Sequence, residues 1–289
     1  MPPFRRLIRF LSKDNLPHYG DPLLPPHTTD IRAATSARLI TGDIHRSPTL
    51  TNTILPITRL LSPLAPNDVR SVRGLGLNYA QHAAESKMPV PAYPILFYKP
   101  TTALGGPGDD IPVPAIAQEV EGVDYECELV IVIGKECRDV IEEEALDYVL
   151  GYSVGNDVSH REWQLKRGGG QWGLGKGFDG WAPYGPGIVT KEVLGDAGKL
   201  VIETKLNGET VQRSSTADMI FGVRRTVSWL SRGTTLKAGD LIFTGTPQGV
   251  GMGRNPPLWL KHGDKVEVSL EGVGTCENKV IFENKSAKL

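Results

Sequence analysis

Short runs of β-forming residues, separated by turn residues, dominate the chain, and this pattern restricts the fold more than any other feature of the sequence. Five such runs occupy residues 128–134, 149–154, 200–206, 240–244 and 264–270. Asn207-Gly208 is the strongest hairpin signal, because both residues accept the left-handed backbone of a two-residue turn. Helix-like patterns are fewer, at 141–148 and 217–230. Because strands do not alternate regularly with helices, the sequence predicts an α+β fold that is mainly β.

The first 65 residues differ from the rest of the chain, since they mix short apolar runs with many prolines. The segment around Pro63 and Pro66 has the composition of a connection, so we expect a small N-terminal domain at 1–65 and a catalytic domain at 66–289. Residues 7–10 predict a first strand. A mitochondrial presequence is the alternative there, because the first residues are basic and contain no acid before Asp14.

Charge and composition limit the partners of this chain. Lys and Arg total 32 against 33 for Asp and Glu, so we expect no nucleic-acid partner and no attraction to an anionic membrane. No stretch approaches the roughly 18 consecutive apolar residues of a transmembrane helix. The three cysteines, Cys127, Cys137 and Cys276, are far apart and odd in number, which favours an intracellular location, cytoplasmic or mitochondrial. A small molecule is the expected partner.

Two acids at the start of the run 128–134 carry the first chemical signal. Glu126 and Glu128 are two residues apart, so on an extended strand they project from the same face while Cys127 faces the opposite side. Neighbouring carboxylates repel each other unless a cation, a proton or a basic side chain compensates. Taken alone, such a pair is more often a solvent-facing strand edge than a functional site.

A third acid shifts this balance toward a metal site. Asp157 follows the apolar run 149–154, so all three acids are expected at strand ends. No Cys or His lies at ligand spacing, and three carboxylates suit a hard cation with oxygen ligands. The sequence therefore predicts that Glu126, Glu128 and Asp157 bind Mg²⁺, with Mn²⁺ or Ca²⁺ as alternatives. About three octahedral positions remain for water or substrate.

The Glu-x-Glu pair and the later Asn-Asp-Val-Ser segment resemble the metal site of the fumarylacetoacetate hydrolase superfamily. Four further segments match that family in order, at residues 76–85, 97–100, 175–179 and 244–251. The match runs from about residue 70 to about residue 283, and residues 163–167 and 171–176 are especially similar to the eukaryotic domain-containing branch. The resemblance implies the mixed β-sandwich roll of the family, preceded by the small N-terminal domain, and usually a homodimer.

The resemblance also implies three catalytic residues. His82 and Glu85 are three residues apart, so one helical turn places them on the same face. In similar enzymes such a pair lies on a lid that orders over the substrate, and the glutamate orients the imidazole, which activates a water. Lys176 is expected to offset carboxylate or enolate charge, and its neighbours Gly175 and Gly177 would let the backbone approach a ligand closely.

Four further residues are expected to bind the substrate: Gln164 through its amide, Thr246 at the substrate carboxylate, Lys99 and Tyr79. For Lys99 a structural ion pair is nearly as good an interpretation. One position departs from the family pattern, because some acylpyruvate-cleaving and oxaloacetate-decarboxylating relatives carry an arginine at or beside the place of Leu77. Without that guanidinium the substrate carboxylate loses a bidentate partner, so the identity of the substrate stays open.

Together these assignments predict a metal-dependent enzyme that stabilises the enolate of a small 2-oxo or 1,3-dioxo acid. Hydrolysis of a carbon–carbon bond in an acylpyruvate or a fumarylacetoacetate-like substrate is expected first, because the His82–Glu85 pair is intact. Oxaloacetate tautomerisation or decarboxylation uses the same enolate and is the alternative. A specialised biosynthetic enzyme with a larger substrate is a further alternative, and so is a non-catalytic binding protein, although none of the expected site residues is missing.

Overall fold

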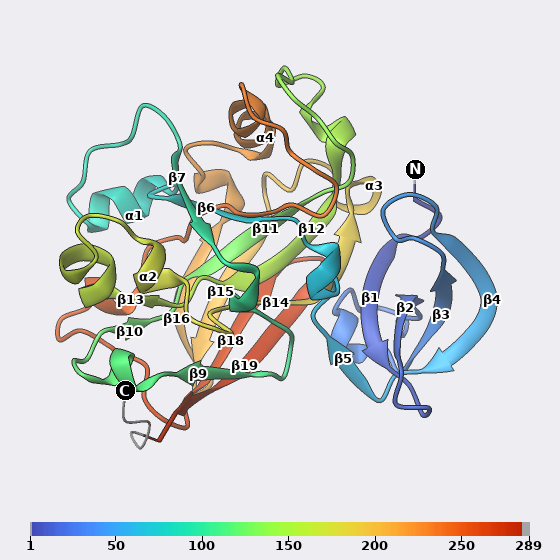
Figure 1. Ribbon diagram of the computed structural model, residues 1–289, viewed down its shortest axis with the longest axis horizontal. Helices are drawn as coiled ribbons and strands as arrows, with labels where there is room; N and C mark the ends of the chain where they lie inside the picture. The colour runs from blue at the N-terminus through green and yellow to red at the C-terminus, as the bar shows by residue number, and fades with distance from the viewer. Residues whose placement is uncertain (1, 285–289) are drawn as a thin grey trace.

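The strands of the molecule form three sheets, and the computed structural model describes residues 2–284 of the chain (Figure 1). The largest sheet has twelve strands in the order β4 (Thr49–Pro56), β3 (Ser36–Thr41), β2 (Pro17–Pro22), β1 (Arg6–Leu11), β14 (Ala182–Thr190), β12 (Val149–Asn156), β11 (Cys127–Ile133), β17 (Leu241–Phe243), β6 (Val72–Gly76) and β7 (Ile95–Lys99), with β5 (Arg59–Leu61) beside β1 and β8 (Leu104–Gly105) beside β14. The second sheet contains β16 (Glu209–Ser215), β15 (Val201–Leu206), β18 (Lys265–Leu270), β19 (Gly274–Phe282) and β9 (Asp110–Val113). A short third sheet pairs β10 (Val123–Asp124) with β13 (Ser159–His160).

The helices are short and lie around the sheets. The α-helices are α1 (Ala80–Glu85), α2 (Gly173–Lys176), α3 (Lys191–Leu194) and α4 (Val223–Ser231), and η6 (Trp163–Arg167) is a π-helix. Single 3₁₀ turns are η1 (Ile31–Ala33), η2 (Pro66–Asp68), η3 (Thr101–Ala103), η4 (Ala115–Gln118), η5 (Ala145–Tyr148), η7 (Thr216–Asp218) and η8 (Gly251–Gly253). The mainly β, α+β fold class expected from the sequence is therefore confirmed.

Two local predictions had different outcomes. The hairpin at Asn207-Gly208 is confirmed, since these two residues join β15 to β16 and have φ values of 52° and 87°. The helix expected over 141–148 is only the 3₁₀ turn η5. Ile141 and the three glutamates at 142–144 are exposed, and the apolar contacts with the core come only from Ala145, Leu146 and Tyr148, so they extend over a single turn.

Strand β11 is buried on both of its faces. Its odd-numbered residues, Leu129 and Ile131 among them, pack into the larger core cluster, which also contains residues of β15, β18 and β19. Val130 and Val132 belong to the second cluster on the other face, together with Phe243 of β17. Hydrogen bonds to β12 on one side and to β17 on the other complete the enclosure. Side chains at the start of β11 are consequently held in place by packing rather than by loop structure.

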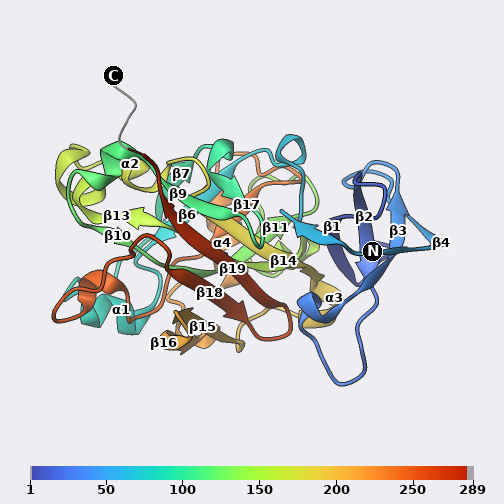
Figure 2. The ribbon, with the colours of Figure 1, turned by 90° about the horizontal axis from the view of Figure 1, so that it is seen from below.

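The strands β1–β5 gather at one side of the molecule, as Figures 1 and 2 show. β1 hydrogen-bonds to β14, with Arg6 opposite Val189, so the strand predicted at residues 7–10 is part of the large sheet. Pro66 begins η2, between β5 and β6, at the place where the sequence predicts a boundary. The division into two domains stays a prediction, because the β1–β14 pairing joins both parts directly.

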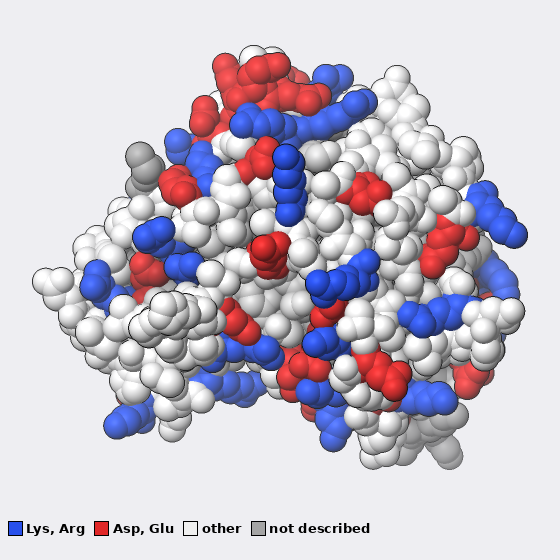
Figure 3. Space-filling view, turned by 180° about the vertical axis from the view of Figure 1, so that it is seen from behind, with Lys and Arg blue, Asp and Glu red and all other residues white. Residues whose placement is uncertain are grey.

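The surface mixes charges of both signs. On the face opposite to that of Figure 1, acidic and basic side chains lie next to one another (Figure 3). Within the part of the chain that the structure describes, no helix combines the length and the apolar character needed to cross a membrane.

The central position of β11 leads to a stability prediction. Ile131→Ala is expected to lower the free energy of unfolding by about 2–5 kcal/mol, because it leaves a cavity between two packed layers. Val201→Ala, in a strand position that is 36% exposed, is the matched control and should change it by less than about 1 kcal/mol. Urea denaturation followed by circular dichroism measures both values. Equal losses would contradict the central position of β11 in the core.

Candidate metal centre and active site

Three buried carboxylates converge where β11 begins and β12 ends. Glu126 directly precedes β11, Glu128 lies in it and Asp157 directly follows β12. The two strands are antiparallel, with Cys127 opposite Asn156, so the beginning of one lies beside the end of the other. One carboxylate oxygen from each acid lies within 4.8 Å of the others, and all three residues are buried. The structure thus brings together the three acids that the sequence places at strand ends.

Backbone hydrogen bonds hold these acids in place. The Glu126 N–H donates to the side-chain oxygen of Asn156 at 3.0 Å, and the Asp157 N–H donates to the Glu126 carbonyl at 2.9 Å. The Gly245 N–H donates to Glu128 Oε2 at 2.7 Å. Each acid is therefore tied to the strand or loop beside it, and the cluster is preorganised by the sheet.

Two lysines balance part of the negative charge. The Lys176 ammonium donates to Glu126 Oε2 at 3.0 Å, to Asp157 Oδ2 at 2.6 Å and to the Ser159 hydroxyl at 2.7 Å. The Lys99 ammonium lies 2.6 Å from Asp157 Oδ1 and also donates to two backbone carbonyls. Burial lowers the pKa of Lys99, whereas for Lys176 the attraction of Asp157 and Glu126 outweighs burial and raises the pKa.

Glu128 differs from the other two acids. Its Oε1 atom is buried without a hydrogen-bond partner, and no ion pair joins Glu128 to a lysine or arginine among residues 2–284. Burial, together with the Asp157 and Glu126 carboxylates, raises the pKa of Glu128 well above its ordinary value. An unpaired buried carboxylate oxygen is costly, and a hard divalent cation would satisfy it. The donor set therefore fits Mg²⁺, Mn²⁺ or Ca²⁺.

The His82–Glu85 pair lies on helix α1, on one face as the spacing predicts. His82 Nδ1 is 3.2 Å from Glu85 Oε2. The Gly249 N–H donates to both oxygens of Glu85, at 3.0 and 3.1 Å, and so fixes the carboxylate. With Nδ1 engaged by Glu85, His82 keeps its Nε2 atom for another partner.

A cavity of about 400 Å³ opens beside this pair. Six of the residues expected at the site line it: His82, Glu85, Glu126, Gln164, Lys176 and Thr246. Glu128 and Asp157 are completely buried and do not line the cavity, and Asp157 contacts the lining residue Lys176. His82, Lys176 and Glu126 thus face a common space that a small molecule can enter.

Lys99 and Tyr79 do not line this cavity. Lys99 contacts Asp157 and two backbone carbonyls, which supports the structural ion pair rather than a contact with substrate. Tyr79 is fully buried and its hydroxyl has no hydrogen-bond partner. Burial, with Cys127 and Glu128 nearby, raises the pKa of this tyrosine well above its ordinary value. Substrate binding by Lys99 and Tyr79 stays a prediction, and their positions outside the cavity do not favour it.

Arg161 and Asp124 are site residues that the sequence reasoning missed. The Arg161 guanidinium contacts Asp124 Oδ2 at 2.8 Å, Glu126 Oε1 at 2.6 Å and Gln164 Oε1 at 2.8 Å. Asp124 also accepts hydrogen bonds from the backbone N–H groups of Gly251 and Met252. Burial alone would raise the pKa of Glu126, but Lys176 and Arg161 outweigh it and lower the pKa to about 2.

Arg161 orients the side chain of Gln164, and a π-helix determines the position of this residue. Its side-chain oxygen accepts from Arg161, which leaves its NH₂ group for a ligand. It lies in the π-helix η6, a form that often marks functional sites. A side chain at Gly175 would collide with the Gln164 backbone. Gly175 therefore permits α2 to pack against η6. The sequence had suggested another reason for a glycine at this position, namely the close approach of a ligand to the backbone.

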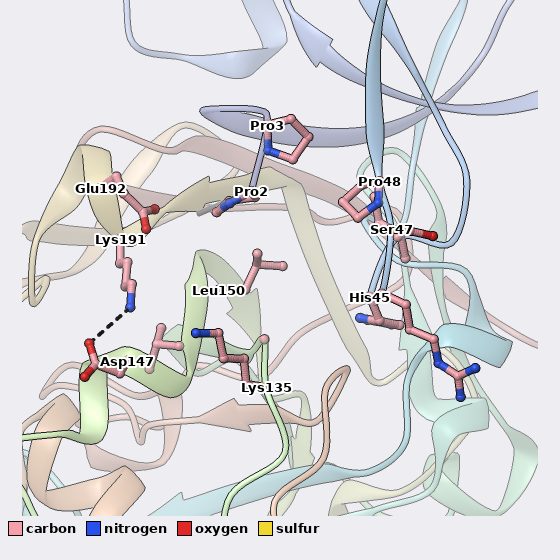
Figure 4. Close-up of a pocket in the computed structure, with 14 residues that line it drawn as sticks. Pro2, Pro3, His45, Ser47, Pro48, Lys135, Asp147, Leu150, Lys191 and Glu192 are labelled. Carbon is pink, nitrogen blue, oxygen red and sulfur yellow. Dashed lines mark ion pairs between the residues drawn. The ribbon is translucent and has the colours of Figure 1, made fainter.

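A second cavity, of about 560 Å³, lies elsewhere (Figure 4). It is formed by Pro2 and Pro3, the loop between β3 and β4, and residues near Lys135, Leu150 and Lys191. Lys191 forms an ion pair with Asp147 at 3.8 Å at its border. None of the residues expected at the site lines this larger cavity, so the smaller one beside the acids is the candidate active site.

The chain is similar to known proteins over most of its length. A family model described as fumarylacetoacetate (FAA) hydrolase C-terminal matches residues 71–281. The oxaloacetate tautomerase fahd2, mitochondrial, of Xenopus laevis is 44% identical over 222 residues, which cover 76% of this chain and 69% of that protein. The fumarylacetoacetate hydrolase domain-containing protein 2 homolog of Dictyostelium discoideum is 45% identical over 242 residues, covering 80% and 77%. A crystal structure of 2-hydroxyhepta-2,4-diene-1,7-dioate isomerase from Mycobacterium marinum has a TM-score of 0.81 and 36% identity, covering 97% and 99%.

Proposed function

This chain belongs to the fumarylacetoacetate hydrolase family, and on that premise we propose that it is a divalent-metal-dependent enzyme that acts on a 2-oxo or 1,3-dioxo acid through an enolate. Its leading reaction is hydrolysis of the carbon–carbon bond of an acylpyruvate. One observation supports this reaction most directly: the His82–Glu85 pair faces the same cavity as Glu126 and Lys176. A base that activates water and a site for enolate charge are what such a hydrolysis requires.

Glu126, Glu128 and Asp157 are the proposed metal ligands. A metal ion held there would supply a Lewis acid for polarising the oxo group of a substrate. Mg²⁺ is the first choice and Mn²⁺ or Ca²⁺ are alternatives, because every donor in the cluster is a carboxylate oxygen.

The residues of the chain account for the remaining steps. Glu85 holds His82 Nδ1, so Nε2 takes a proton from water, which attacks the acyl carbonyl of the substrate. The carbon–carbon bond then breaks, and its electron pair forms the enolate of pyruvate, which is protonated on carbon. The products are pyruvate and a carboxylic acid. The Lys176 ammonium and the Gln164 NH₂ group offset the charge of the enolate.

Thr246 adds a hydroxyl group to the lining of the cavity. Its hydroxyl oxygen accepts a hydrogen bond from the Gln212 amide at 2.9 Å, so its own hydrogen is free to donate to a substrate carboxylate. Gln212 in turn donates to the Pro247 carbonyl, which fixes the amide. The threonine thus presents a donor of defined direction to the cavity.

Tautomerisation of oxaloacetate is the second candidate, and the name of the relative from Xenopus laevis favours it. It needs no attack by water, because a proton moves only between carbon and the oxo oxygen. His82 alone could move that proton. Decarboxylation of oxaloacetate would use the same enolate.

Metal removal tests the proposal. Turnover of acetylpyruvate, fumarylpyruvate and oxaloacetate by the full chain should fall by about 100-fold or more in EDTA and return with added Mg²⁺. Pyruvate release, measured with lactate dehydrogenase, separates hydrolysis from tautomerisation, which instead changes the ultraviolet absorbance of the enol without releasing pyruvate. Decarboxylation is separated from both by release of carbon dioxide. Metal-independent turnover of all three acids would overturn the proposed mechanism.

A further inference from the structure

Polar and apolar side chains both line the candidate active site. The polar ones include Glu126 and Lys176, as described above. Six apolar side chains form what we call the apolar wall: Leu77, Met88, Ile95, Leu165, Trp172 and Met252. A substrate whose oxo acid group binds to the polar side chains therefore has these apolar side chains available for its other end.

The cationic side chains that line this cavity already have carboxylate partners. Lys176 contacts Glu126 and Asp157, and Arg161 contacts Asp124 and Glu126. Glu85 adds a carboxylate beside the apolar wall, with 24% of its side chain exposed. A second carboxylate on the substrate would lose hydration there without gaining a free guanidinium or ammonium group. The charge pattern therefore disfavours a dicarboxylate.

The shape of the wall favours an apolar group. The Trp172 indole lies against Gly76, where an added side chain would collide with the ring. The Phe97 ring also contacts the indole, with 5.8 Å between the ring centroids. Met88 and Leu165 line the same space while each is 50% exposed. Exposed apolar surface of this kind is stabilised when an apolar group covers it.

The volume of the cavity also favours a substrate with an apolar group. Cavities that enclose drug-sized ligands measure roughly 300–1,000 Å³, and this one measures about 400 Å³. An acid of four carbon atoms would leave much of the apolar wall uncovered.

From these observations we propose that the substrate is a 2,4-dioxo acid whose acyl end carries an uncharged apolar group, aromatic or branched aliphatic. Leu77 and Trp172 select this group over a second carboxylate. The inference rests on the proposed function and deepens it, because the reaction is unchanged. Water adds to the acyl carbonyl, the carbon–carbon bond breaks, and the products are pyruvate and the apolar carboxylic acid.

Steady-state kinetics with Mg²⁺ test this specificity. We expect kcat/KM for 2,4-dioxo-4-phenylbutanoate to exceed that for acetylpyruvate and for fumarylpyruvate by about tenfold or more, mainly through KM. Leu77→Arg should shift the phenyl-to-fumaryl ratio toward fumarylpyruvate by about tenfold or more, since it adds a guanidinium to the wall. Leu77 has a φ of 50°, a strain that arginine shares, so this variant changes only the side chain. Trp172→Ala should reduce turnover of the phenyl substrate more than that of acetylpyruvate.

A binding measurement provides a readout that does not depend on turnover. N-phenyloxamate and oxamate mimic the oxo acid group with and without an apolar end, and calorimetry on the Mg²⁺-loaded protein should show at least about tenfold tighter binding of the phenyl compound. Metal-dependent turnover of acetylpyruvate and fumarylpyruvate, with no preference for either phenyl compound, would overturn this inference and leave the proposed function intact. No metal-dependent turnover of any acid would overturn the proposed function, and the calorimetry would then still decide whether the wall prefers an apolar group.

Discussion

Replacing Glu128 with glutamine is expected to remove metal binding and to lower kcat/KM for hydrolysis by about a thousandfold or more. Glutamine preserves the volume and the hydrogen bond from Gly245, but it replaces a carboxylate by a neutral amide beside Asp157 and Glu126. The proposed metal centre would lose one of its three protein ligands. A thousandfold loss of kcat/KM corresponds to about 4 kcal/mol of transition-state stabilisation. Metal content measured by mass spectrometry and kcat/KM measured on the same preparation check this expectation.

Two controls separate loss of the metal from loss of the fold. Glu209→Gln changes an exposed glutamate at the start of β16 and should leave metal content and activity unchanged. Circular dichroism of Glu128→Gln should match that of the unaltered protein, because the amide fills the same space. One metal ion per chain together with full activity in Glu128→Gln would show that Glu128 is not a ligand.

The acid cluster illustrates what the sequence could predict and why. The two-residue period of a strand places Glu126 and Glu128 together, and Asp157 directly after an apolar run indicates a strand end. The pattern of residues does not show that β11 and β12 are antiparallel neighbours, and this pairing is what brings Asp157 to the glutamates. The family resemblance supplied that missing long-range contact.

The features that were missed depend on contacts between distant parts of the chain. Arg161 meets Asp124 across 37 positions of sequence, and its importance appears only when η6 brings Gln164 to the same guanidinium. Lys99 is a second example of a long-range contact that the sequence does not show. Its positive charge is evident from the sequence, but its ion pair with Asp157 is seen only in the structure. The segment at 141–148 shows that acids in a first turn do not produce an α-helix when the apolar contacts with the core extend over a single turn.

His82→Asn is expected to lower pyruvate release from an acylpyruvate by about 10²–10⁴-fold while leaving metal content unchanged. Asparagine fits the space and can still donate to Glu85, but its amide cannot take a proton from water near neutral pH. The proposed metal ligands do not include His82, so loss of activity with normal metal content would distinguish this residue from Glu128. Glu85→Gln should lower pyruvate release by a smaller factor. The His82 imidazole would keep a hydrogen-bond partner, but this partner would be a neutral amide in place of a carboxylate.

The same variant separates the two candidate reactions. If His82 activates water for hydrolysis, the His82→Asn variant should no longer release pyruvate from an acylpyruvate. Enolisation of oxaloacetate would depend on the metal and Lys176 instead, so this activity should persist at least in part. If His82 moves the proton between carbon and oxygen, both activities fall together. His262→Asn, an exposed histidine whose Nδ1 accepts from the Phe282 N–H and which does not line the cavity, is the matched control and should not affect either activity. Hydrolysis by His82→Asn within about threefold of the unaltered enzyme would exclude His82 as the base, because removal of a general base costs far more than that.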